Sequence, residues 1–326
     1  MKEGTLYSSF SILISDPIDN TVINKLIQKG FQVNYNPTIT RNEILEIIEN
    51  YDILIVRSRT KVDKEVIERG KRLKIIARAG VGLDNIDVDE AVKRGIKVIY
   101  APGASTDSVA ELTIGLMIIA ARNLYNSITF TKNGIFKKVE GFELKNKILG
   151  IVGLGRIGTR VAQIAKALGM RIVAYDIIDV SSKARELEIS ITNSLDELLS
   201  ISDIISLHAS VTNKKSIPII SEREFKIMKD GVIIINTSRA SLIDGKALLR
   251  YLELGKVGFY AADVMWNEPP KEDWELKIIS HDRVIITPHI GAQTKEAQKR
   301  IGEAIFENII KAVEEIRNVI INTGSS

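Results

Sequence analysis

The chain has 326 residues, 45% of them hydrophobic and 26% charged, which is typical of a globular protein with about two domains. The net charge of +4 is spread among interleaved acids and bases, which argues against a nucleic-acid partner and suits an anionic substrate. The absence of cysteine excludes disulfides, thiolate nucleophiles and cysteine metal sites, and we expect no metal.

Nothing in the sequence predicts export or a membrane partner. Residues 1–4 are not followed by an apolar run of signal-peptide length, and no stretch is long and apolar enough to cross a bilayer. We therefore expect a cytoplasmic protein. The excess of isoleucine over leucine, together with abundant Lys and Glu, fits either a heat-adapted source or a bias in genome composition.

The first hundred residues predict strands that alternate with helices, which favours a parallel sheet covered on both faces. Strands are predicted at 10–15, 31–35, 52–56, 73–77 and 97–100. Helices are predicted at 19–29, 41–50, 62–69 and 89–94.

A break at 102–105 marks the first domain boundary. The helix predicted at 108–123 is apolar over most of its surface, so we expect it to be buried between domains or subunits. Further strands are predicted at 148–152, 171–175, 203–207, 231–235, 257–263 and 283–287. The helical stretch 294–318 is expected to return to the N-terminal domain. That domain would then comprise residues 1–101 plus 292–326, and the other domain residues 102–291.

A glycine fingerprint follows the strand predicted at 148–152. Gly153 would make a tight turn, Gly155 would leave room for a pyrophosphate, and Gly158 would let helix and strand approach closely. The N-terminus of the following helix favours phosphate. Asp176, after the next strand, can bind both ribose hydroxyls and would repel a 2′-phosphate. The motif predicts NAD as the cofactor, whereas a glycine turn needed only for packing is the alternative.

The three histidines separate by their place relative to the strands, because ligands of an open α/β sheet bind beyond the carboxyl ends. His281 precedes a strand and is read as a surface residue. His208 follows a strand and either lines the cofactor or is simply packed. His289 follows the last strand, between a proline and a glycine, and is the candidate acid/base.

Charged residues at other strand ends complete the candidate site. Arg239 can bind a carboxylate with two parallel hydrogen bonds. Glu268, before two prolines, can orient His289, and Asp263 can bond a nicotinamide amide. The basic segment 57–61 is either an anion site or a solvated turn, and the glycine turn 78–82 can form a carboxylate nest.

Five segments in this order resemble the D-isomer-specific 2-hydroxyacid dehydrogenase family over nearly the whole chain: 78–87, 153–158, 236–239, 263–270 and 287–291. The resemblance implies two doubly wound parallel-sheet α/β domains, with a Rossmann NAD-binding domain inserted into a flavodoxin-like substrate domain. It implies a small 2-hydroxy acid substrate, phosphorylated at the end that Arg57 would bind, and a homodimer or homotetramer.

The resemblance also implies roles for individual residues. Arg239 would hold the substrate carboxylate, and His289, supported by Glu268, would transfer the proton. Cofactor contacts are implied for Gly153, Gly155, Arg156, Ile157, Gly158, Asp176, His208, Thr237, Ser238, Asp263, Gly291 and Ala292. Substrate contacts are implied for Arg57, Ser58, Ala79, Gly80, Val81 and Ser105.

Some positions depart from the family pattern. Ser105 stands where an asparagine often lies near the substrate, and Ala240 and Ser241 replace common glycines. Two alternatives stay open. One is the reduction of glyoxylate, hydroxypyruvate or a similar unphosphorylated acid, and the other is an NAD-sensing scaffold on the same fold.

Overall fold

The computed structural model describes residues 7–211 and 217–323. The chain divides into two compact units, each considered by itself below. Unit 1 comprises residues 1–105 and 292–326, and unit 2 comprises residues 106–291. The chain therefore leaves unit 1 after Ser105 and re-enters it at Ala292.

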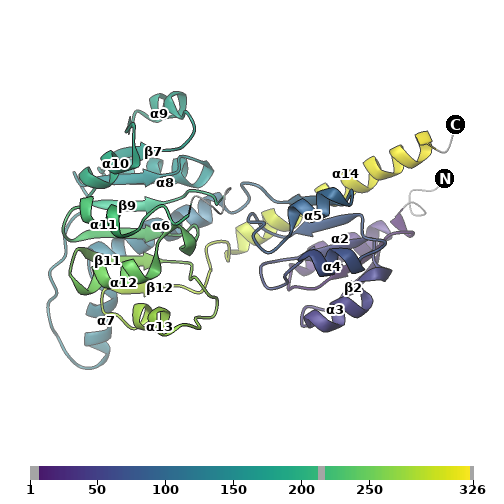
Figure 1. Cartoon of the computed structure of the whole chain (residues 1–326), viewed down its shortest axis with the longest axis horizontal. Helices are drawn as coiled ribbons and strands as arrows, with labels where there is room; N and C mark the ends of the chain where they lie inside the picture. The colour runs from purple at the N-terminus through teal and green to yellow at the C-terminus, as the bar shows by residue number, and fades with distance from the viewer. Residues whose placement is uncertain (1–6, 212–216, 324–326) are drawn as a thin grey trace. The chain divides into compact units, whose positions relative to one another are not determined.

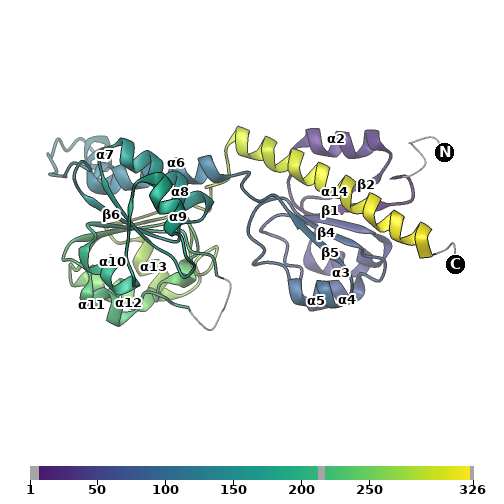
Figure 2. The same ribbon diagram turned by 90° about the horizontal axis from the view of Figure 1, so that it is seen from above.

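Unit 1 is a parallel five-stranded sheet in the order β2-β1-β3-β4-β5, the flavodoxin-like order. Helices α2 and α14 cover one face, and α3, α4 and α5 cover the other (Figure 2). The strands are β1 (Ser11–Ile14), β2 (Gln32–Tyr35), β3 (Ile53–Val56), β4 (Ile75–Arg78) and β5 (Lys97–Tyr100). The helices are α2 (Asn20–Lys29), α3 (Arg41–Ile47), α4 (Lys64–Arg69), α5 (Val88–Lys93) and α14 (Lys295–Thr323).

The returning helix α14 completes the core of unit 1. Its residues Ile301, Ile305 and Ile309 recur every four positions, so they form one stripe that packs beside Val22 and Leu26 of α2. Strand β3 is buried along its whole length, as expected for a strand covered on both faces. The predicted return of the C-terminal helix is therefore observed.

Unit 2 is a parallel seven-stranded sheet in the order β12-β11-β10-β9-β6-β7-β8, which is the Rossmann order extended by one strand. Its strands are β6 (Ile148–Val152), β7 (Arg171–Tyr175), β8 (Ser190–Ile191), β9 (Ile204–Leu207), β10 (Val232–Asn236), β11 (Val257–Ala262) and β12 (Val284–Ile286). Its helices are α6 (Thr106–Ala121), α7 (Leu124–Lys132), α8 (Arg156–Ala167), α9 (Ser181–Leu187), α10 (Leu195–Ile201), α11 (Glu222–Ile227), α12 (Gly245–Glu253) and α13 (Asp273–Ile279). Helices α6 and α8 pack on one face and α10 to α13 on the other (Figures 1 and 2).

Helix α6 begins and ends two residues earlier than predicted. It ends at Ala121, because Asn123 adopts a left-handed φ of 46°, and the unpredicted α7 follows. Many of its buried residues, among them Ala110 and Met117, join the core of unit 2 with α8 and the sheet. Within the described residues no single helix is long and apolar enough to cross a membrane, and α6 and α7 reach such a length only as a pair bent by 67°.

Candidate active site

A cavity of about 420 Å³ opens at the carboxyl edge of the unit 2 sheet, where the strand order reverses between β6 and β9. Gly153 follows β6, Asp176 follows β7 and His208 follows β9, and all three line the cavity. A reversal of this kind is where doubly wound sheets bind ligands. The structure therefore brings these three residues together at one edge of the sheet.

The three glycines of the fingerprint serve different purposes. Gly153 has a φ of 95°, and a Cβ there would lie 2.7 Å from the backbone nitrogen of Ala209. At Gly158 a Cβ would lie 2.1 Å from the carbonyl oxygen of Gly153. At Gly155, which precedes α8, a Cβ would meet nothing within 4 Å. Packing thus requires the first two glycines, whereas Gly155 leaves room for a ligand at the helix N-terminus, where Arg156 and Ile157 begin.

Asp176 is tied to the glycine turn. Its Oδ2 accepts a hydrogen bond from Leu154 N at 2.8 Å, and its Oδ1 accepts from Ile178 N at 3.3 Å. The carboxylate is partly exposed in the cavity wall, the place that a ribose-binding acid requires. NAD therefore fits the glycine turn, the helix N-terminus and this acid.

His208 is both packed and at the cavity. Its Nε2 lies 2.8 Å from Oγ of the buried Ser206. Burial lowers the pKa of His208 to about 4, so the ring is neutral at physiological pH. Of the other histidines, His281 caps the turn before β12, where its Nδ1 accepts from Arg283 N at 3.1 Å.

His289 and Glu268 form a pair at the ends of two neighbouring strands, β12 and β11. His289 Nδ1 lies 2.9 Å from Glu268 Oε2 and 3.1 Å from Oε1, and both side chains are about two-fifths exposed. Burial raises the pKa of Glu268, but the hydrogen bond and charge of His289, a bond from Met265 N and the charge of Arg239 hold it below its usual value. An imidazole backed by a carboxylate in this way can accept or donate a proton at its other nitrogen.

The loop that carries His289 is shaped by Asp263, which is buried at 2% exposure. Its Oδ1 accepts from Thr287 Oγ1 at 2.5 Å and from Ile290 N at 2.8 Å, and its Oδ2 accepts from Gly291 N at 2.7 Å. His289 itself has a left-handed φ of 55°, a strained conformation for a non-glycine residue. The sequence suggested a nicotinamide contact for Asp263 and missed this structural role.

Arg239 follows β10 in a turn that Asn236 fixes. Asn236 is fully buried, accepts from Ser238 N at 3.1 Å and donates to the carbonyl oxygen of Arg239 at 3.0 Å. Arg239 Nη1 donates to the carbonyl oxygen of Ser238 at 2.8 Å, and Thr237 Oγ1 lies 2.8 Å from Thr113 Oγ1 of α6. The sequence analysis gave Asn236 no role of its own, although an asparagine that ends an apolar strand is a typical turn signal.

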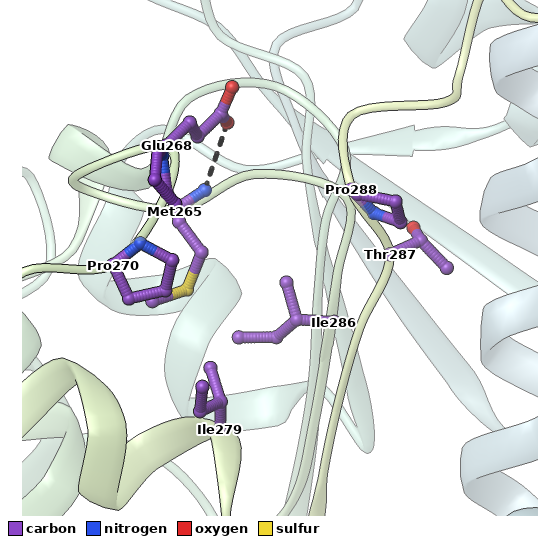
Figure 3. A pocket seen from close by; sticks show the side chains of 8 residues that line it. Met265, Glu268, Pro270, Ile279, Ile286, Thr287 and Pro288 are labelled. Carbon is purple, nitrogen blue, oxygen red and sulfur yellow. Dashed lines mark hydrogen bonds between the residues drawn. The ribbon is translucent and has the colours of Figure 1, made fainter.

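A second cavity of about 420 Å³ lies beside Glu268, with Met265 and Ile286 in its largely apolar wall (Figure 3). The figure shows the Glu268 carboxylate turned back toward Met265 N, from which it accepts a hydrogen bond at 3.1 Å. The backbone of this loop therefore helps to set the direction of the carboxylate.

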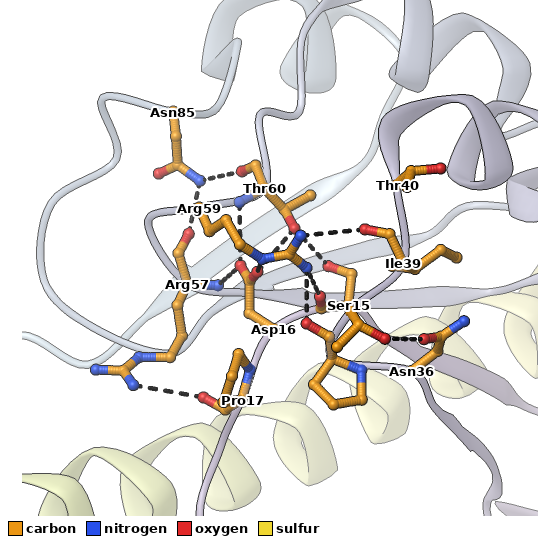
Figure 4. Close-up of polar contacts among 12 residues, drawn as sticks. Ser15, Asp16, Pro17, Asn36, Ile39, Thr40, Arg57, Arg59, Thr60 and Asn85 are labelled. Atoms are coloured by element: carbon orange, nitrogen blue, oxygen red, sulfur yellow. Dashed lines mark hydrogen bonds and ion pairs between the residues drawn. The ribbon is translucent and has the colours of Figure 1, made fainter. Parts of the chain in front are cut away.

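In unit 1 the basic segment is organised around the buried Asp16 (Figure 4). Arg59 Nε donates to Asp16 Oδ1 at 2.9 Å, and its guanidinium also bonds the carbonyl oxygens of Ser15, Pro37 and Ile39. The Arg59 side chain is 49% exposed, but its guanidinium is held by these partners within unit 1. Arg57 Nη1 reaches the carbonyl oxygen of Pro17 at 3.4 Å, and burial lowers the pKa of Arg57, against the charge of Asp16.

The other predicted substrate contacts in unit 1 differ in exposure. Ala79 and Ser105 are buried at 5% and 4%, whereas Ser58 and Val81 are exposed. At Gly80 a Cβ would lie 1.5 Å from Arg78 Nη1, so a side chain at this position would displace that guanidinium. Among the described residues no group of three His, Asp or Glu side chains could hold a metal ion.

Comparison with known proteins finds one family model and several dehydrogenases and reductases that are similar to this chain. Residues 114–291 match the family described as "D-isomer specific 2-hydroxyacid dehydrogenase, NAD binding domain". A D-3-phosphoglycerate dehydrogenase from Methanocaldococcus jannaschii is 42% identical over 95% of this chain, which spans only 59% of that relative. A hydroxypyruvate reductase from Thermotoga maritima is 43% identical over 93% of this chain and 98% of its own length. A crystal structure of a glyoxylate reductase from Paecilomyes thermophila is 34% identical with a TM-score of 0.85, covering 94% of this chain and 95% of its own.

Proposed function

The chain belongs to the D-isomer specific 2-hydroxyacid dehydrogenase family, and from that premise we propose that it oxidises 3-phospho-D-glycerate to 3-phosphohydroxypyruvate with NAD. This reaction is the first step of serine biosynthesis. The observation that carries the proposal is the contact of 2.9 Å between His289 Nδ1 and Glu268 Oε2. This pair follows the carboxyl ends of two strands of the same sheet whose carboxyl edge holds the cavity lined by Gly153, Asp176 and His208, here called the NAD cavity.

Each side chain has a proposed part in the reaction. With Nδ1 turned to Glu268, His289 takes the C2 hydroxyl proton at Nε2 as the C2 hydrogen leaves as hydride. Glu268 stabilises the imidazolium that results, and Arg239 holds the substrate carboxylate and polarises the C2 oxygen. NAD supplies the hydride acceptor. General acid–base help of this kind is worth about 10²–10⁴ in rate.

The identity of the substrate depends on Arg57, which we propose binds the phosphate. Two relatives named D-3-phosphoglycerate dehydrogenase favour this substrate, although the chain spans only 59% of each. Reduction of hydroxypyruvate or glyoxylate is the second candidate. It is favoured by the hydroxypyruvate reductase that matches over 98% of its own length. It is also favoured by the ion pair of Arg59 with Asp16, which offsets one positive charge of the basic segment.

The test is turnover, followed by NADH fluorescence, with a panel of phosphorylated and unphosphorylated 2-hydroxy acids. We expect Arg57→Ala to raise KM for 3-phosphoglycerate far more than for glycerate, whereas Lys61→Ala, an exposed neighbour, should change neither. Equal losses for both substrates would overturn the phosphate assignment. No turnover with any 2-hydroxy acid would instead favour an NAD-sensing scaffold. We also propose a homodimer or homotetramer, which sedimentation would test.

A further inference from the structure

Glu275 is a completely buried carboxylate near the start of α13. Its Oε1 accepts hydrogen bonds from the backbone nitrogen of Asn267 at 2.8 Å and from Asn267 Nδ2 at 3.2 Å. Its Oε2 accepts from the backbone nitrogens of Lys271 and Glu272 at 2.8 and 2.9 Å, and from Asn267 Nδ2 at 3.1 Å. Burial raises the pKa of Glu275, but these bonds outweigh it and hold the pKa below its usual value.

The groups that Glu275 binds lie on both sides of Glu268. Asn267 immediately precedes Glu268, and Lys271 follows it by three residues. The buried carboxylate therefore ties together the two ends of segment 267–271, while the Glu268 side chain points away to His289. Because an ionised carboxylate only accepts hydrogen bonds, it can satisfy all of these donors at once.

The start of the same loop is anchored separately. Trp266 Nε1 donates to the carbonyl oxygen of Ile243 at 2.9 Å, and its ring meets Trp274 edge-on with centroids 5.0 Å apart. The Glu268 side chain is itself 42% exposed, so side-chain packing does little to fix it. Its direction depends on the hydrogen bond from Met265 N and on the backbone of segment 267–271, which Glu275 holds.

We propose that Glu275 is a positioning residue: it fixes segment 267–271 so that Glu268 meets Nδ1 of His289. This inference rests on the proposed function, since it assigns Glu275 a part in the same proton transfer. All five described hydrogen bonds of the Glu275 carboxylate go to residues 267, 271 and 272, so it acts through the segment and not on the reacting groups.

The first test is a double-mutant cycle on kcat. Glu275→Gln keeps the side chain's size but turns an NH₂ group against N–H donors, so we expect kcat to fall by up to about 100-fold, the cost of a misplacement near 1 Å. The Kd for NADH should stay unchanged. Lys277→Gln, an exposed change on α13, should leave both values unchanged. In a Glu268→Gln background, adding Glu275→Gln should cost little more, and an independent, multiplicative loss would overturn the proposal.

The second test does not depend on turnover. The imidazole ¹⁵N resonances of His289, identified by their loss in His289→Asn, should move in Glu275→Gln toward their positions in Glu268→Gln. Wild-type resonances in Glu275→Gln would overturn the proposal. If that variant does not fold, Asn267→Ala can replace it, because it removes only the two bonds from Asn267 Nδ2 to Glu275. The His289 resonances should then move in the same direction but by less. No movement in Asn267→Ala would overturn the proposal. Absent turnover in the wild type would count against the proposed function alone, because the resonances still decide the role of Glu275.

Discussion

The loop that carries His289 should lose its shape when Asp263 becomes asparagine. The Asp263 carboxylate accepts three hydrogen bonds, two at Oδ1 and one at Oδ2. An asparagine side chain can keep the two at one oxygen but turns an NH₂ group toward Gly291 N. A bond to a charged group is worth about 1.5–3 kcal/mol, and a buried unpaired donor costs about 1–3 kcal/mol. We therefore expect Asp263→Asn to lower the free energy of unfolding of unit 2 by roughly 2–4 kcal/mol.

Urea unfolding followed by tryptophan fluorescence measures this loss. The chain has two tryptophans, Trp266 and Trp274, and both belong to unit 2 near this loop. Asp282→Asn is the matched control, because Asp282 is exposed just before β12, and its effect should stay within about 0.5 kcal/mol. A loss of that small size in Asp263→Asn would refute the view that Asp263 holds the loop.

Three further predictions follow from the glycine turn, the ribose-binding acid and a buried carboxylate of unit 1. Gly158→Ala would place a Cβ 2.1 Å from the Gly153 carbonyl oxygen, so it should lower the free energy of unfolding by about 1–3 kcal/mol and weaken NADH binding. A urea titration measures the first effect and a fluorescence titration with NADH the second. Asp176→Asn should raise the affinity for NADPH relative to NADH roughly five- to tenfold, because a like charge at 4 Å costs about 1 kcal/mol in water; an unchanged ratio in fluorescence titrations would contradict this. Burial raises the pKa of Asp52, but the hydrogen bonds from Lys74 and Ser11 lower it below its usual value. Its stabilisation should therefore be complete above its unfolded pKa of about 3.9 and fade as pH falls further, so the unfolding curves of Asp52→Asn and wild type, followed by circular dichroism, should converge at low pH.

Much of the fold could be predicted because apolar runs and glycine turns are local signals. The alternation of strands and helices indicated parallel sheets, and the glycines at 153–158 indicated the turn between β6 and α8. The contact of His289 with Glu268 was also within reach, since β11 and β12 follow one another in the chain and their carboxyl ends lie at one edge. Helix α7 was missed because the turn at Asn123 has no glycine or proline to mark it.

Buried polar partners were the features that the sequence did not reveal. Arg59 looks like Arg57 in the sequence, yet its guanidinium turns inward to Asp16 and to carbonyl oxygens of another loop. Asp263 and Glu275 likewise look like ordinary loop or helix acids, although each organises a segment next to the candidate site. Which donors surround such a carboxylate depends on loop geometry, and residue type and spacing do not specify it.

The most direct test of the account is the turnover of His289→Asn. With 2-hydroxy acid and NAD, kcat should fall by about 10²–10⁴, while the Kd for NADH stays as in wild type, because His289 is not among the residues lining the NAD cavity. Activity retained to within about twofold would contradict the proposed role of His289 as acid and base, and the proposed mechanism with it.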